Sequence, residues 1–172
     1  MTRRLIFAAA LLALAACDKN EAAEKEEMTA DEVAAQLASV KVEPGQWEST
    51  TQILSAEGPL PQNVLQQMAG QRTSASNCIT PEQAARPSAN FLAAQQNNNC
   101  TYQDFRMQGG KLSGRMTCSG GQLPGAMTTI MNGDYGPRGY DMMMDMETPG
   151  LPGTGPMRIK ARTQGRRVGD CG

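Results

Sequence analysis

The chain of 172 residues contains no histidine. This absence excludes the Ser-His-Asp and Cys-His catalytic arrangements and removes the side chain that most often binds metal ions. Hydrolysis by two carboxylates needs only Asp or Glu, and the candidates on predicted strands are Glu48, Asp104, Asp141 and Asp145. They show no paired spacing, and each is typical of a solvated strand face. The sequence therefore predicts no catalytic residue and favours a non-enzymatic protein, with a hydrolase as the weaker alternative.

The chain also has few aromatic side chains, no long apolar run and almost no net charge. Aromatic residues make up only 4% of the chain, and the longest apolar run falls well short of the roughly 20 residues that a membrane-spanning helix needs. The formal net charge is −1, which gives no support to a nucleic-acid partner. Because a core with few large side chains usually needs covalent help, these shortages predict a small domain that contains disulfides.

The N-terminal residues have the pattern of a bacterial export signal. Two arginines precede the apolar run Leu5 to Leu14, which leads into Leu14-Ala15-Ala16-Cys17. These last four residues resemble a lipobox, and the resemblance implies that residues 1–16 are removed and that Cys17 is lipidated, with palmitate among its acyl chains. An ordinary cleaved signal peptide is the alternative. Because two or more acyl chains hold a protein stably in a bilayer, we expect a lipid-anchored protein on the periplasmic side of a bacterial membrane.

Residues 17–42 are expected to form a flexible tether and one short helix. Asp18 resembles a signal that retains lipoproteins in the inner membrane of some enteric bacteria, so it favours the inner over the outer membrane. The residues from there to about Met28 are mostly small or charged, which is typical of a solvated segment. Thr29 and Glu32 then form a capping-box pattern, and a helix is expected before Pro44.

Four cysteines lie downstream of Cys17, and an even number in an exported chain predicts two disulfides. A tight turn at Gly109-Gly110 would bring Cys100 and Cys118 to within one position of directly opposite on a hairpin. Cys78 would then pair with Cys171. Zinc ligation is the alternative, but the chain offers neither CxxC spacing nor histidine.

From residue 43 onward the pattern is that of a mainly β domain. Strands are expected over 47–54, 72–78, 100–107, 111–118, about 126–132, about 139–147 and 156–163, with short helices near residues 64–68 and 80–85. Gly- and Pro-rich connections separate the strands, for example Asn132-Gly133-Asp134. We predict an antiparallel meander, curved or partly closed, with two or three short helices. A two-layer α+β arrangement is the alternative.

Seven of the chain's 12 methionines lie between Met127 and Met157. Met142, Met144 and Met146 share one face of a predicted strand, and methionine is a pliable filler for a core that is short of aromatics. Two alternatives stay open: thioethers are soft ligands for Cu(I), and a flexible methionine surface could hold an apolar ligand. No cofactor is otherwise predicted.

The last predicted strand carries a basic stripe of Arg158, Lys160 and Arg162 on one face. The favoured interpretation is cross-strand pairing with Asp141, Asp145 and Glu147 of the preceding strand. Contact of the stripe with anionic lipid headgroups near the anchor is the alternative.

Several motifs together resemble the DUF3617 family, a family of exported bacterial proteins, many of them lipoproteins, whose function is not established. These are Pro44-Gly45-Gln46-Trp47-Glu48, Cys78-Ile79-Thr80-Pro81-Glu82, the Cys100 and Cys118 hairpin, Asp134-Tyr135-Gly136 through Tyr140, and Arg166-Arg167-Val168-Gly169-Asp170-Cys171. The resemblance covers residues 43–172 and contributes no catalytic residue. We therefore expect a lipid-anchored envelope protein that binds an apolar ligand or scaffolds an envelope protein in the periplasm, without enzymatic activity.

Overall fold

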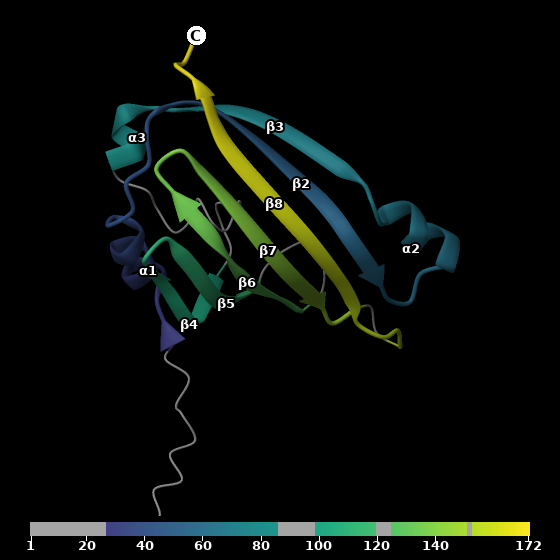
Figure 1. Cartoon of the computed structure of the whole chain (residues 1–172). Coiled ribbons are helices and arrows are strands. Elements are labelled where there is room, and N and C mark those ends of the chain that lie inside the picture. Colours follow the sequence, from purple (N-terminus) through teal and green to yellow (C-terminus); the bar gives the residue numbers. More distant parts are fainter. Residues whose placement is uncertain (1–26, 86–98, 120–124, 151–152) are drawn as a thin grey trace, which may run out of the picture.

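In the residues that the structure describes, the fold is a single open antiparallel sheet with three short helices. Figure 1 shows the computed structural model, in which residues 27–85, 99–119, 125–150 and 153–172 are described. The eight strands follow the order β1-β4-β5-β6-β7-β8-β2-β3. Their bounds are β1 Glu27–Met28, β2 Gly45–Glu57, β3 Arg72–Ile79, β4 Asn99–Gln108, β5 Lys111–Ser119, β6 Ala126–Gly136, β7 Gly139–Thr148 and β8 Met157–Gly169. The helices are α1 Ala30–Leu37, α2 Gln62–Met68 and α3 Pro81–Ala85.

The predicted mainly β class is confirmed. Strands β4 to β8 form the expected meander, and β2 and β3, which precede them in the sequence, extend the sheet beyond β8. None of the helices in the described residues has the length and apolar composition needed to cross a membrane.

Helix α1 covers one face of the sheet at β4, and that face is called the inner face below. The helix begins with the predicted capping box: the Thr29 backbone N–H donates to the Glu32 carboxylate at 2.7 Å, and the Glu32 N–H donates to the Thr29 hydroxyl. Its apolar stripe is buried in one cluster with the inner-face residues of β4 to β7, where Tyr102 and Phe105 meet edge to face. The core therefore sits between α1 and the β4 half of the sheet.

The predicted tether is wrong at its C-terminal end. Glu27 and Met28 form β1 and pair with Gln103 and Tyr102 of β4 instead of remaining solvated. The reason is that Met28 is apolar and packs against the core cluster just before the cap of α1. Cys17, Asp18 and the signal residues 1–16 lie outside the described residues.

The predicted connection at Asn132-Gly133-Asp134 is also wrong, because these residues lie inside β6. The turn comes later, between Gly136 and Gly139. Gly133 is needed for close packing instead: a Cβ on it would lie 2.2 Å from the Asp141 carbonyl oxygen of β7. The last strand likewise continues to Gly169 and does not stop at residue 163.

Candidate functional site

Two disulfides join the four downstream cysteines. Cys100 and Cys118 are register partners on β4 and β5, with their Cα atoms 4.1 Å apart. Cys78 of β3 is joined to Cys171, just beyond β8, with a Cα–Cα distance of 5.6 Å. These are the two pairs that the sequence predicts. Since β2 lies between β3 and β8, the second bridge ties three strands together at one end of the sheet.

Four of the five motifs that carry the family resemblance lie at that same end, whereas the Cys100–Cys118 pair lies at the other end of β4 and β5. Trp47 of β2 is the register partner of Arg167 of β8, and the Arg167 guanidinium donates to the Pro44 carbonyl oxygen at 2.7 Å. Gly45 has no room for a side chain, because a Cβ there would lie 2.4 Å from the Gly169 carbonyl oxygen. We call Pro44, Gly45, Trp47, Arg167 and Gly169 the clasp.

Aromatic packing extends the clasp onto β7. The Trp47 ring stacks on Tyr140, with ring centroids 6.5 Å apart and planes 15° apart. Tyr140 in turn covers Gly165, where an added Cβ would lie 2.2 Å from the ring. Burial raises the pKa of the Tyr140 hydroxyl, so the group stays neutral at physiological pH. Trp47, Tyr140 and Gly165 are therefore engaged in packing against one another.

The face opposite α1, called the outer face below, carries charges arranged by strand. Cations of β8 lie between anions of β7 and β2, and the predicted cross-strand pairing is confirmed. The ion pairs are Arg158–Glu147 at 2.8 Å, Lys160–Asp145 at 3.7 Å, Arg162–Asp141, and Arg166–Glu48 at 3.2 Å. These pairs are solvent-exposed, so each contributes little to stability. Their main effect is that acidic side chains of β7 and β2 neutralise the positive charge of the β8 stripe along its length.

The structure does not assemble the carboxylates into an acid–base pair. Asp141 and Asp145 lie four residues apart on β7, while Glu48 lies on β2 with β8 between. A hydrogen bond from the Arg162 guanidinium lowers the pKa of the Asp141 carboxyl, whereas a general acid needs a raised pKa. Asp104 lies at an irregularity of β4 with a φ of 52° and is exposed.

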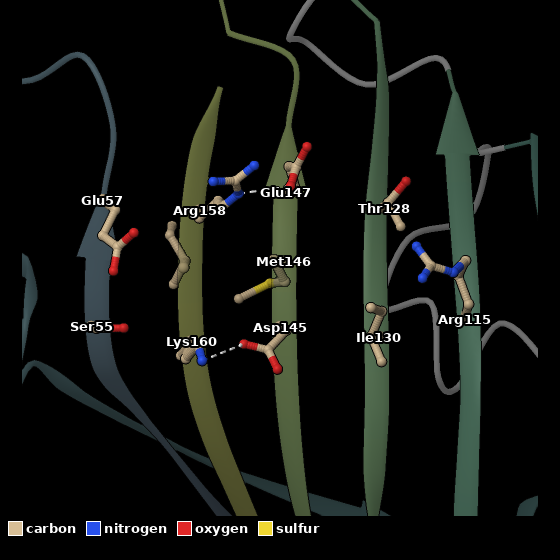
Figure 2. Close-up of a pocket in the computed structure, with 11 residues that line it drawn as sticks. Ser55, Glu57, Arg115, Thr128, Ile130, Asp145, Met146, Glu147, Arg158 and Lys160 are labelled. Atoms are coloured by element: carbon tan, nitrogen blue, oxygen red, sulfur yellow. Dashed lines mark hydrogen bonds and ion pairs between the residues drawn. The ribbon is translucent and has the colours of Figure 1, made fainter. Parts of the chain in front are cut away.

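A hollow of about 200 Å³ lies on the outer face. Figure 2 shows its lining residues on five neighbouring strands, with Glu57 of β2 at one side and Arg115 of β5 at the other. The Arg158–Glu147 and Lys160–Asp145 pairs stand between them. Sequence reasoning missed this hollow because it depends on which strands become neighbours.

Of the three cations that line the hollow, Arg158 and Lys160 are in ion pairs, whereas the guanidinium of Arg115 is available to bind a ligand. It makes no ion pair or hydrogen bond with the described residues, and its register partner on β6 is the apolar Ile130. The hollow could therefore take a small ligand with an acidic group near Arg115 and an apolar part over Ile130. No cluster of three or more Cys, Asp or Glu side chains suited to a metal ion exists in the described part of the chain.

Met142 and Met144 of β7 pack on the inner face, as the alternation predicts, while Met146 is among the residues that line the outer-face hollow. Met142 is only 9% exposed and belongs to the core cluster, Met144 packs against that cluster, and Met146 is half-buried. Met142 lies opposite Gly133, which leaves space for its long side chain. This burial supports the packing interpretation, and the Cu(I) interpretation stays a prediction.

Replacing Met142, Met144 and Met146 together with leucine separates these interpretations. Leucine keeps volume and apolarity, so we expect the variant to fold with a loss of less than about 1.5 kcal/mol per site. Chemical unfolding measures that loss, and anaerobic Cu(I) titration measures metal affinity in both proteins. Tight Cu(I) binding by the natural sequence that disappears in the leucine variant would contradict the packing interpretation.

Comparison with family models gives a match over most of the chain. Residues 42–171 match the model of a family described as a protein of unknown function, DUF3617. No curated protein and no solved structure matches the chain. The matched region contains the clasp, both disulfides and the outer-face hollow.

Proposed function

This chain belongs to the DUF3617 family, and we propose that it is a lipid-anchored protein of the bacterial cell envelope that binds or scaffolds a partner on the periplasmic side without catalysing a reaction. Its membrane contact is the lipid on Cys17. Nucleic acid is not among its partners, and the outer-face hollow around Arg115 is the place where we expect a small ligand to bind.

The observation that carries this proposal is that four of the five cysteines form disulfides and the fifth, Cys17, lies in the lipobox-like segment. The two disulfides occupy all four downstream cysteines, and disulfides persist in oxidising compartments such as the periplasm. Cys17 is the remaining cysteine, and it directly follows Leu14-Ala15-Ala16. A lone thiol at that position has an evident use as the acceptor of lipid. The chain thus combines the cysteine pattern of an exported, oxidised domain with a residue suited to lipid anchoring.

The character of the outer face supports binding rather than catalysis. The carboxylates of β7 are held by cations of β8, and the pKa of Asp141 is lowered. With its pKa lowered by the hydrogen bond from Arg162, the Asp141 carboxyl remains ionised near neutral pH and is unsuited to donating a proton. Fixed charges beside an apolar patch instead favour recognition of a ligand with complementary charge.

Replacing Cys17 with serine tests the anchor. Lipid attachment needs the thiol, so the Cys17→Ser protein should lose stable membrane attachment and leave the detergent phase in a phase-partitioning experiment. The matched control is Cys100→Ser with Cys118→Ser, which removes two cysteines without touching the anchor and should still partition with membranes. If the Cys17→Ser protein partitions with membranes like the natural sequence, the proposed anchor is wrong.

A further inference from the structure

The two edges of the sheet differ in their protection against further strand pairing. An edge strand exposes unpaired N–H and C=O groups, and proteins usually cover or distort such edges. At the β4 edge, β1 is only two residues long, and the register of β4 shifts between Gln103 and Arg106. The Gln36 side chain of α1 then contacts the β4 backbone, at the Phe105 oxygen (3.5 Å) and the Met107 nitrogen (3.3 Å). This edge is blocked by a bulge and a side-chain amide.

The β3 edge has none of these protections. Its register with β2 is regular from Arg72 to Ile79, without a bulge, and its sequence contains no proline or lysine. Residues 72–78 are all exposed. Within the described residues β2 is the one strand that pairs with β3, and Figure 1 shows β3 along the outside of the sheet. In the described part of the chain, an edge of eight residues with regular register is thus open.

The hydrogen bonds of β2 show which groups of β3 point outward. The Ile53 N–H donates to the Gln71 carbonyl oxygen at 2.9 Å, and the Ile53 carbonyl oxygen accepts from the Gly70 N–H at 2.7 Å. Ile53 therefore turns its backbone groups toward β3, and Thr51 and Ser49 do the same because this direction alternates along a strand.

The register partners of Thr51 and Ser49 are Thr73 and Ala75, so these two residues turn their backbone groups toward β2. The intervening residues of β3 must then turn theirs away from β2. They are Arg72, Ser74, Ser76 and Cys78. Four residues on the open edge thus present paired donors and acceptors to a further strand.

We propose that β3 pairs in antiparallel fashion with β3 of a second copy of this chain, about a two-fold axis at Ala75. Ser74 then lies opposite the partner's Ser76, and Arg72 opposite the partner's Cys78. All of these residues are outward-facing, so each pair can exchange two backbone hydrogen bonds. Ala75 meets the partner's Ala75 at a non-hydrogen-bonded position, where side chains approach most closely. A small residue suits that position.

Charge and polarity favour a second copy over an apolar strand of another protein. Arg72 is the charged residue of β3, it lies at one end, and it shares the outer face with Glu48, the neighbour of Ser76 on β2. In the antiparallel pair Arg72 extends toward the partner's Glu48, and the two arginines stay far apart. A parallel pair would place like charges side by side. Serine, threonine and asparagine flank the edge, so an apolar strand would find no apolar pocket there.

Cysteine substitution in the full-length chain tests this pairing. In the Ala75→Cys protein the two new thiols face each other across the axis, so most of the protein should form a covalent dimer on a non-reducing gel. Thr73→Cys is the matched control: it is two residues away, but it lies opposite the partner's Asn77 and should remain monomeric. Co-expression of Thr73→Cys and Asn77→Cys proteins should restore a covalent dimer.

A second substitution shows whether the covalent dimer requires backbone hydrogen bonds at the β3 edge. Ser76→Pro removes an N–H that β2 does not use and keeps the hydrogen bond between the Thr50 and Ser74 hydroxyls, so the Ala75→Cys, Ser76→Pro protein should keep its melting temperature and lose the covalent dimer. Ser74→Pro, which also removes that hydrogen bond, serves the same purpose if Ser76→Pro fails to fold. The proposal is overturned if Ala75→Cys stays monomeric, if Thr73→Cys links equally well, or if Ala75→Cys links to a different protein. These outcomes are independent of the Cys17 result.

Discussion

Replacing Cys78 and Cys171 together with alanine should produce the largest loss of stability of any change considered for the folded domain. The bridge closes a loop with a sequence separation of 93 residues, and a loop of that size is worth up to about 4.7 kcal/mol in the chain-entropy model. Folded domains are stable by only about 5–15 kcal/mol. We therefore expect a fall in melting temperature of roughly 10 °C or more, measured with the disulfide Cys100–Cys118 intact.

The matched control is the alanine replacement of Cys100 and Cys118. That bridge closes a separation of only 18 residues, for which the model gives about 3 kcal/mol. The two variants should differ in unfolding free energy by about 1–2 kcal/mol in urea. Equal stability of the Cys78 and Cys171 variant and the natural sequence would show that the bridge across β2 does not hold the end of the sheet.

Gly165→Ala should clearly destabilise the clasp region. Its new Cβ would lie 2.2 Å from the Tyr140 ring, and that ring stacks against Trp47 and cannot retreat without breaking the stack. Overpacking of this kind typically costs about 1–3 kcal/mol. Tyrosine and tryptophan fluorescence during urea unfolding measures both the loss of stability and any change in the stack.

Gly169→Ala is the matched control for that substitution. Gly169 is on the same strand, but an added Cβ would meet no atom within 4 Å, so the variant should be as stable as the natural sequence. The Tyr140→Ala, Gly165→Ala double variant supplies the second check. Because alanine removes the ring that clashes, the two effects should be clearly non-additive. Strict additivity would show that Tyr140 is not the group that excludes a side chain at Gly165.

The features that the sequence predicts well are those governed by short-range periodicity. Alternation along a strand places Met142 and Met144 on one face and Asp145 on the other, and the acidic face then meets the basic face of Arg158 and Lys160 on the next strand. The Cys100–Cys118 hairpin follows from a turn at two glycines. Each of these predictions needs only neighbours in the chain, and each matches the structure.

The features that the sequence does not predict depend on the order of strands in the sheet. Gly133 looks like a turn residue, but β7 approaches so closely there that no Cβ fits. The hollow beside Arg115 requires β2, β8, β7, β6 and β5 to be neighbours. The open edge of β3 likewise exists because β2 inserts between β8 and β3. A single sequence shows alternation within a strand but not which strands will meet.

The most direct test of the central claim is the intact mass of the protein extracted from membranes and analysed without reduction. A lipid-anchored, disulfide-bonded envelope protein should begin at Cys17, carry the mass of three acyl chains on that residue, and be four hydrogens lighter than the form with all four downstream thiols reduced. Native spectra of the same sample would show any small ligand that remains bound. A chain that begins elsewhere, carries no acyl mass or has free thiols at Cys78 and Cys171 would contradict the proposed function.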